Sequence, residues 1–359
     1  MSLIVDAHED IAYNMLTYGR NYLKSVSETR RSEAGTDVVQ RANGDSLLGL
    51  PEYRAGRVAL VFSTLFAAPK RCAAEWEGQI YADKEQAHRL YRGQLDLYHR
   101  LAGEHPEAFR LVKTRAEMDS HLAAWQNGGS AGQPIGLVFL MEGAEGVRRP
   151  AELAEWWELG LRIIGPAWVG TRFCGGMGEP GPLTAEGFEL LDAMGDMGFA
   201  LDISHMDEKA ALQSLERFPG KIIASHANAN ALLRRSDNRH LPDEVIRGLI
   251  ERGGVMGVMP LNTFLRTGWK HGEDKNLVTL EDLAAHVDYV CQMAGNADHV
   301  GVGTDFDGGF GMQSTPAEID SIADLPKLGD VLTRKGYTQA QVEAVMGGNW
   351  IRMLEQILP

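Results

Sequence analysis

Eight short apolar runs, each ending in polar residues and separated by stretches of helical periodicity, constrain the fold of this chain more than any other feature of its sequence. Each run is short and apolar enough to form a strand buried on both faces, as strands of a parallel sheet are. The runs span residues 3–7, 58–62, 136–141, 161–167, 199–204, 221–225, 254–259 and 300–304. They predict a sheet of eight parallel strands.

The segments between these runs carry apolar residues at the spacing of an amphipathic helix. Segment 83–102, for example, places Ala87, Tyr91 and Tyr98 at helical intervals. Similar patterns occur at 151–160, 184–197, 207–218, 242–252 and 280–293. This alternation favours the α/β class, as a closed (β/α)8 TIM-type barrel. The alternative, an open doubly wound sheet, usually carries a Gly-rich phosphate-binding turn after its first strand, and this sequence has none there.

Two segments interrupt the alternation and predict inserted loops over the carboxyl-end face of the barrel. Residues from about 19 to 51 are polar, and residues 173–182 are rich in glycine, which predicts a second, mobile loop. Residues 338–358 predict one or two closing helices, interrupted near Gly347 and Gly348. A length of 359 residues is normal for a barrel with insertions, so we expect one domain over residues 1–359.

Composition excludes several classes of protein. Hydrophobic residues make up 44% and charged residues 23%, which is typical of a globular chain rather than a disordered one. The net charge of −14 repels phosphate backbones, so we expect no nucleic-acid partner. No stretch approaches the ~20 apolar residues of a membrane span, so we expect no membrane partner.

Three widely spaced cysteines, Cys72, Cys174 and Cys291, form no CxxC pair. Neither a thiolate zinc site nor a disulfide framework is therefore indicated, and a reduced, cytoplasmic setting fits best. The first residues have no basic segment and no long apolar stretch, so we expect no signal peptide.

Residues that commonly bind metals or transfer protons stand where the predicted strands end. In a (β/α)8 barrel these carboxyl ends all face one rim, which is where active sites are built. The six residues come from the first, third, fifth, sixth and eighth strands, and are His8, Asp10, Glu142, His205, His226 and Asp305. We expect them to converge at one site.

Imidazole and carboxylate side chains together suit zinc or a similar divalent ion. His8 and Asp10 are two residues apart, so both can point the same way from an extended segment. Glu142 follows an apolar run, where an acid is costly to bury unless it is paired or metal-bound, and bridging two cations is its natural use. Each motif alone has a plain structural alternative, a hydrogen-bonded core histidine or a salt bridge at the rim. Recurrence on five strands favours the metal centre.

Asp305 and Arg239 are the predicted reactive and substrate-binding residues. Asp305, the first residue after the last strand, is favoured over Asp307 as the rim-facing acid, since an acid beside a metal-bound water can accept its proton. Asp307 is more typical of a turn cap before Gly308. Arg239 follows the sixth strand and can bind a carboxylate bidentately, although a surface arginine before a helix near Pro242 is the alternative.

These motifs resemble those of the renal (membrane) dipeptidase family of zinc metallopeptidases, and they run in the family's order over essentially the whole chain. The matching segments are Asp6-Ala7-His8-Glu9-Asp10, Glu142-Gly143, Asp202-Ile203-Ser204-His205, Ser225-His226, Asn238-Arg239-His240-Leu241-Pro242, Gly303-Thr304-Asp305-Phe306-Asp307-Gly308 and Gly348-Asn349-Trp350. The resemblance implies an amidohydrolase-like barrel with two Zn2+ ions per chain.

The resemblance also implies a role for each residue. His8 and Asp10 would hold one zinc ion, His205 and His226 the other, and Glu142 would bridge them. Arg239 would match the arginine that binds the terminal carboxylate of the substrate. Asp305 would match the aspartate near the bridging water and the substrate amine.

Trp168 departs from the family pattern. The fourth strand of the family usually ends in a histidine that contacts the scissile carbonyl or the developing oxyanion, and Trp168 stands at the corresponding position here. Losing an oxyanion donor can cost a factor of about 10² to 10³ in rate. We expect Trp168 to shape the substrate pocket, with an indole N–H that can still donate one hydrogen bond.

The sequence thus predicts a metal-dependent dipeptidase in which a bridging hydroxide attacks the amide of a dipeptide or a small N-acyl amino acid. Glu142 and Asp305 are the expected catalytic residues, and Arg239, Trp168 and Asp305 the expected substrate-binding ones. The alternatives are a lactonase or non-peptide amidase on the same metal centre, and a metal-binding protein with little catalysis. We therefore expect the partner of this chain to be a small-molecule or dipeptide substrate. A homodimer is compatible with this prediction.

Overall fold

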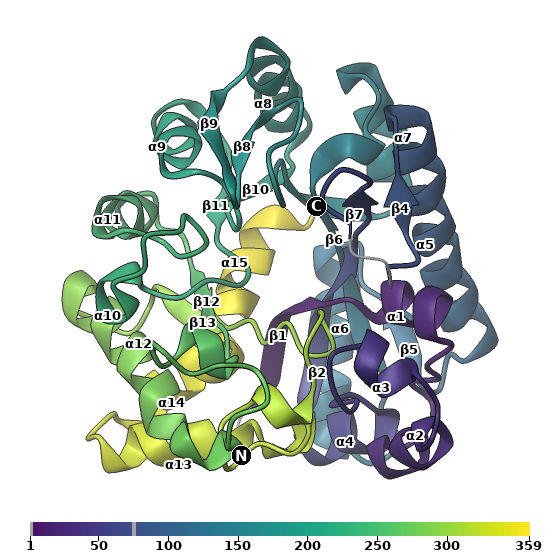
Figure 1. The fold of residues 1–359 in the computed structure, drawn as a ribbon, viewed down its shortest axis with the longest axis vertical. Coiled ribbons are helices and arrows are strands. Elements are labelled where there is room, and N and C mark those ends of the chain that lie inside the picture. The colour runs from purple at the N-terminus through teal and green to yellow at the C-terminus, as the bar shows by residue number, and fades with distance from the viewer. Residues whose placement is uncertain (1–2, 74–76) are drawn as a thin grey trace.

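A computed structural model describes residues 3–73 and 77–359 of the chain. Eight parallel strands of the described residues form a barrel, and every one of them falls on a predicted apolar run (Figure 1). They are β1 (Ile4–Glu9), β2 (Val58–Leu65), β6 (Ile135–Glu142), β7 (Leu161–Gly165), β10 (Ala200–Asp202), β11 (Ile222–Ile223), β12 (Met256–Val258) and β13 (Val300–Val302). The fold is the predicted α/β barrel.

Neighbouring strands in the barrel are also neighbours along the chain. Their order is β11-β10-β7-β6-β2-β1-β13-β12. Strands β1 and β13, the first and last of the eight along the chain, pair at Asp6 and Val302. A parallel bridge between Ala224 and Met256 joins the two ends of this series. A further strand, β5 (Phe109–Leu111), pairs with β6 outside the ring. All eight carboxyl ends therefore face the same rim.

Helices surround the barrel in Figure 1, and most correspond to the predicted amphipathic segments. Polar side chains cap several of them, as when the Asp83 side chain accepts a hydrogen bond from the Gln86 backbone N–H at the start of α5. The helices are α5 (Lys84–Glu104), α6 (Arg115–Gly128), α7 (Leu153–Glu158), α8 (Ala185–Met197), α9 (Glu208–Arg217), α10 (Asn230–Leu233), α11 (Asp243–Glu251), α12 (Leu280–Ala294) and α13 (Pro326–Arg334).

The C-terminal segment contains the predicted interruption. Helix α14 (Gln339–Glu343) and helix α15 (Asn349–Ile357) are joined by one π-helical stretch, η7 (Ala344–Gly348). The Trp350 indole N–H donates to the Val302 carbonyl at 2.9 Å, and a Cβ on Gly301 would lie 2.3 Å from that nitrogen. This glycine therefore lets α15 pack directly on β13.

The segment from about residue 19 to 51 is not the long loop that its polarity predicts. It forms α2 (Val26–Glu33), α3 (Val38–Arg41) and the start of α4 (Leu50–Ala55), after α1 (Ile11–Tyr18). Asp307 holds this segment on the rim: its carboxylate pairs with Arg20 at 3.1 Å and accepts a hydrogen bond from Tyr22 at 3.0 Å. Asp307 is thus a buried anchor rather than a simple turn cap.

The second predicted loop is also ordered in part. Residues 173–182 contain an antiparallel hairpin of β8 (Cys174–Gly176) and β9 (Glu179–Leu183). A short parallel pair, β3 (Ala68–Pro69) and β4 (Ile80–Tyr81), lies after β2. Backbone pairing explains the hairpin and the short parallel pair, since it stabilises glycine-rich or short segments that show no apolar pattern.

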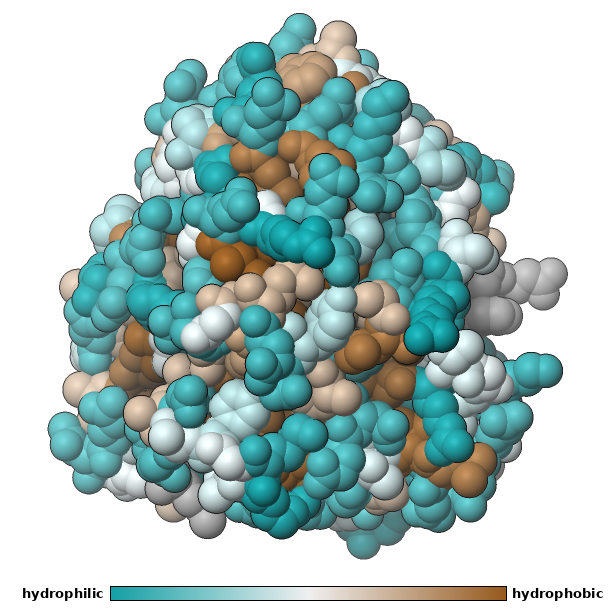
Figure 2. Space-filling view, turned by 90° about the vertical axis from the view of Figure 1, so that its left-hand side faces the viewer, coloured by the Kyte–Doolittle hydropathy of each residue, from teal (hydrophilic) through white to brown (hydrophobic). Residues whose placement is uncertain are grey.

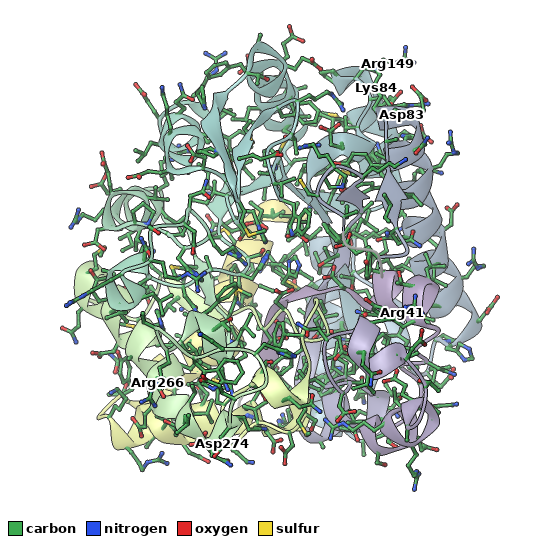
Figure 3. The ribbon with its side chains drawn as sticks, viewed as in Figure 1. Arg41, Asp83, Lys84, Arg149, Arg266 and Asp274 are labelled. Atoms are coloured by element: carbon green, nitrogen blue, oxygen red, sulfur yellow. The ribbon has the colours of Figure 1, made fainter. Side chains whose placement is uncertain are left out.

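Charged side chains cover the outside of the molecule. Lys84, Arg149 and Asp274 lie at its outer edge, pointing away from the barrel (Figure 3). On the side that carries α9 to α12, hydrophobic residues form small separate areas among hydrophilic ones (Figure 2), as is usual for a globular surface. No helix within the described ranges has the length and apolar character needed to cross a bilayer.

Candidate metal centre

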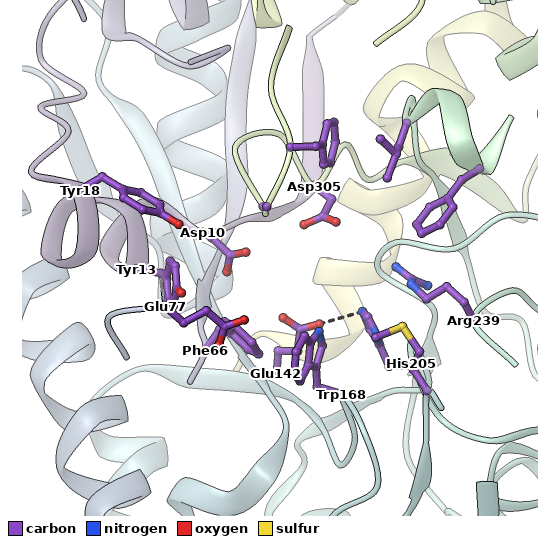
Figure 4. A pocket seen from close by; sticks show the side chains of 16 residues that line it. Asp10, Tyr13, Tyr18, Phe66, Glu77, Glu142, Trp168, His205, Arg239 and Asp305 are labelled. Atoms are coloured by element: carbon purple, nitrogen blue, oxygen red, sulfur yellow. Dashed lines mark ion pairs between the residues drawn. The ribbon is translucent and has the colours of Figure 1, made fainter. Parts of the chain in front are cut away.

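The residues predicted from the strand ends meet at the carboxyl-end rim, around a cavity of about 240 Å³ (Figure 4). Several line the cavity directly, whereas His8 and His226 are buried and contact Glu142. The set that comes together consists of His8, Asp10, Glu142, Trp168, His205, His226, Arg239 and Asp305.

Glu142, the last residue of β6, stands between the histidines. Its Oε1 lies 2.9 Å from His205 Nε2 and 3.5 Å from His226 Nε2, and its Oε2 lies 3.5 Å from His8 Nε2. The Nε2 atoms of His205 and His226 are 2.8 Å apart. Atoms that share one zinc ion at about 2.0–2.2 Å lie roughly 3–3.5 Å from one another. The spacing of these side chains therefore suits a shared cation.

Among the described residues, two groups of three side chains have ligand atoms within 4.8 Å of one another: His8 with Glu142 and His226, and His8 with Asp10 and Asp305. Both groups include His8, so they form one continuous cluster. Nitrogen and carboxylate ligands of this kind suit zinc and similar divalent ions. The division of the ligands between two zinc ions remains a prediction from the family resemblance.

Several buried atoms in this cluster have no hydrogen-bond partner among the described residues. They include both ring nitrogens of His8, Oδ1 of Asp10 and Nδ1 of His205. Leaving a buried polar atom unpaired costs roughly 1–3 kcal/mol, so natural proteins rarely do it without a reason. A cation bound by His8 Nε2 and Asp10 Oδ1 would satisfy two of these atoms.

The electrostatics of the cluster also call for positive charge. Burial lowers the pKa of His8, but the carboxylates of Glu142, Asp10 and Asp305 outweigh it and raise this pKa to about 10. Burial raises the pKa of Asp10 to about 7, against the attraction of His8. Burial and the Arg239 guanidinium lower the pKa of His205 to about 4. Bound divalent cations would take the place of the proton on His8 as the positive charge that balances these carboxylates.

A hydrogen-bond chain behind His226 sets the orientation of its ring. Ser225 Oγ lies 2.8 Å from His226 Nδ1 and donates to Asp202 Oδ2 at 2.5 Å. Asp202 Oδ1 also accepts the backbone N–H groups of Ser204 and Ser225. Nδ1 is therefore the protonated nitrogen, and the Nε2 lone pair faces Glu142. Sequence reasoning assigned no role to Asp202 or Ser225, although both belong to the paired Ser-His motifs.

We expect Ser225→Ala to weaken zinc binding about 10- to 100-fold, because His226 loses the group that fixes its tautomer. Competition with a chromophoric chelator measures this affinity directly. Ser214→Ala is the matched control, since Ser214 is equally buried but donates to Ala210 within α9. Wild-type zinc affinity in Ser225→Ala would show that this chain does not orient the ligand.

The backbone at the strand ends is itself unusual. His205 and Asp305 have positive φ angles of 63° and 57°, a region that few residues other than glycine adopt. Such conformations cluster at functional sites. A Cβ on Gly308 would lie 2.0 Å from Asp305 Oδ1, so the turn after β13 closes tightly around this carboxylate. Asp305 lines the cavity and lies 3.8 Å from His8 Nε2, whereas Asp307 turns toward Arg20.

Arg239 reaches the opposite side of the cavity from Asp10 (Figure 4). Its side chain is buried, and its guanidinium donates to the His226 carbonyl at 3.3 Å. It also lies 5.4 Å from the centre of the Phe264 ring. These contacts fix the guanidinium at the cavity wall, where its remaining donors can meet an anionic group.

Trp168 follows β7 by three residues and lines the cavity. Its ring packs edge-to-face against Phe66, with 5.0 Å between the ring centres. His121, on α6, lies outside the cavity lining and contacts the Ala59 carbonyl at 2.8 Å.

Relatives with established or provisional names cover most of this chain. An uncharacterized dipeptidase of Schizosaccharomyces pombe is 28% identical over 365 residues, which covers 98% of this chain and 79% of the relative. An uncharacterized protein in the pqqA 5' region of Klebsiella pneumoniae is 34% identical over 233 residues, covering 62% of this chain and 82% of the relative.

A solved structure shares the fold. The metallo peptidase from Rhodobacter sphaeroides, solved with a phosphinate mimic of the dipeptide L-Ala-D-Ala, superposes with a TM-score of 0.79 at 24% identity. The match covers 99% of this chain and 100% of the other. The sequence also matches the membrane dipeptidase family, peptidase family M19, over residues 1–358. On the strength of that whole-length match, this chain belongs to the membrane dipeptidase family of metallopeptidases.

Proposed function

We propose that this chain is a two-zinc dipeptidase that hydrolyses the amide bond of a dipeptide or a small N-acyl amino acid. The observation that carries the proposal is the meeting of three imidazoles and three carboxylates, from five different strand ends, around Glu142. The family match and the dipeptidase names of the curated relatives support the same activity.

The side chains divide into two sets of ligands around one shared carboxylate. His8 and Asp10 would hold one cation, His205 and His226 the other, and Glu142 would contact both. When bound, the pair of cations would lower the pKa of a shared water molecule and polarise the scissile carbonyl.

Asp305 is suited to carry the proton. Burial raises its pKa well above the usual value, with Asp10 and Glu142 adding to the effect and His8 and Arg239 opposing it. A carboxylate in this position can accept a proton from the attacking water and donate it to the departing amine nitrogen. Because Asp305 lines the cavity opposite Glu142, it can face both the water and the amide.

Arg239 would bind the terminal carboxylate of the substrate, and the burial of its side chain would strengthen this contact because buried charges are less screened by water. Trp168 would replace a polar contact to the scissile carbonyl with an aromatic surface. Its position favours testing esters and lactones beside dipeptides, since the same centre can hydrolyse either.

The test is to load the purified protein with zinc, measure bound metal by mass spectrometry, and assay a panel of dipeptides and lactones. We expect about two zinc ions per chain, dipeptide turnover exceeding lactone turnover, and loss of both after chelation. Recovery of activity when zinc is restored separates metal removal from unfolding. A protein that binds no zinc, or that binds it and hydrolyses no dipeptide of the panel, contradicts the proposal.

A further inference from the structure

The carboxylate of Asp305 depends on its own backbone for its orientation. It points into the cavity from the turn after β13 (Figure 4). Among residues 3–73 and 77–359, no N–H or O–H group donates a hydrogen bond to it, and the ion pair that it makes, with His8 Nε2, is 3.8 Å long. The φ angle of Asp305 is 57°, a conformation that is costly for residues other than glycine. Such a backbone persists only where neighbouring contacts hold it.

Thr304, the residue before Asp305, supplies these contacts. Its hydroxyl donates to Asp6 Oδ2 at 2.5 Å and accepts the backbone N–H of Phe306 at 3.1 Å. Its backbone N–H donates to Asp6 Oδ1 at 2.7 Å. The hydroxyl therefore spans Asp305 and closes a tight turn around it, as short hydroxyl side chains do in loops. One side chain thus fixes the residues on both sides of Asp305.

Asp6 ties this turn to the strand that carries His8. It lies on β1, is fully buried, and also accepts the backbone N–H of His8 at 3.4 Å. The backbone N–H of Asp305 donates to the His8 carbonyl at 3.2 Å. The position of the Asp305 carboxylate relative to the His8 imidazole is therefore set by hydrogen bonds between the ends of β1 and β13.

The same hydrogen-bond pattern recurs in the other half of the cluster. Asp202 accepts two backbone N–H groups and the Ser225 hydroxyl. Asp6 likewise accepts two backbone N–H groups and the Thr304 hydroxyl. In both cases the hydroxyl belongs to the residue directly before a predicted site residue. The recurrence at two pairs of strand ends favours a role in holding the residues that these ends carry.

We propose that Thr304, held by Asp6, is a positioning residue that keeps the Asp305 carboxylate directed at the scissile amide. The inference rests on the proposed function, in which Asp305 transfers the proton. Proton transfer requires the two heavy atoms to come within about 2.6–3.2 Å, and a misplacement of about 1 Å can lower the rate about 100-fold. Without the Thr304 hydroxyl the turn loses two hydrogen bonds, so the costly backbone conformation of Asp305 can relax.

Thr304→Val tests this proposal, because valine has the shape of threonine but lacks the hydroxyl. We expect kcat for a dipeptide to fall about 10- to 100-fold, while the bound metal per chain stays at that of the wild type. Thr304→Ser keeps the hydroxyl and should retain a kcat near that of the wild type. Thr304→Ala also lacks the hydroxyl and replaces Thr304→Val if circular dichroism shows that the valine variant does not fold.

A double-mutant cycle with Asp305→Asn separates positioning from a general structural role. Because Thr304 acts through Asp305 in this proposal, Thr304→Val should change kcat by less than about twofold in the Asp305→Asn enzyme. A structural role would lower kcat equally in both backgrounds, and that result overturns the inference. Unchanged kcat in Thr304→Val overturns it too, as does loss of bound metal, since Thr304 would then act through the metal ligands.

Thr315→Val is the matched control. Thr315 is also fully buried, and its hydroxyl donates to the Met312 and Ile319 carbonyls, outside the cavity lining. This variant loses a buried hydroxyl but should retain the wild-type kcat. A wild-type enzyme that hydrolyses no dipeptide, or full activity in Asp305→Asn, counts instead against the proposed function.

Discussion

Asp305→Asn is expected to lower kcat by a factor of about 10² to 10⁴ while the metal content per chain stays at that of the wild type. The asparagine side chain has the size of aspartate, but it cannot accept a proton from the attacking water and return it to the leaving amine. Steady-state kinetics on a dipeptide, with metal analysis of the same sample, measures both quantities.

Asp298→Asn controls for the loss of a carboxylate near the same strand, since Asp298 is exposed and lies just before β13, at the opposite end from Asp305. It should retain wild-type kcat. Full activity in Asp305→Asn would show that another group carries the proton. Loss of bound metal in that variant would instead identify Asp305 as a metal ligand. This is the direct alternative, because Asp305 lies in one group of possible ligands with His8 and Asp10.

The barrel was predictable because its strands are buried on both faces. A parallel strand in such a position is mainly apolar, so the runs at β2 and β6 are recognisable in the sequence. The site followed from the same pattern, since carboxyl ends of parallel strands share one rim. His8, Glu142 and His226 could be placed together without knowledge of any distance between them.

The segments over the rim could not be predicted by the same reasoning. Helix α2 has polar residues on most of its surface and is stabilised by the capping box of Ser25 and Glu28, a signal of only a few residues. Its position depends on the buried pair of Arg20 and Asp307, which are distant in sequence. The contacts of Phe66 with Tyr13 and Trp168 could not be predicted either, because these three residues belong to no common motif and come from separate parts of the chain.

Arg239→Met is expected to lower kcat/KM for a dipeptide by a factor of about 30 to 4,000, the range that follows from removing one partner of a buried charge pair. Methionine retains the packing on Phe264 but removes the guanidinium. The effect should depend on the substrate's own charge: a dipeptide whose terminal carboxylate is amidated should be hydrolysed equally by both proteins. The ratio of kcat/KM for the free and amidated dipeptides is therefore the measurement, since a general loss of folding would lower both.

Arg235→Met is the matched control. Arg235 also lies over the Phe264 ring, at 5.6 Å, but it pairs with Asp237 and does not line the cavity. Its ratio for the two substrates should equal that of the wild type, because only a guanidinium inside the cavity can distinguish a carboxylate from an amide there. An Arg239→Met enzyme that still prefers the free carboxylate would place the carboxylate elsewhere in the cavity.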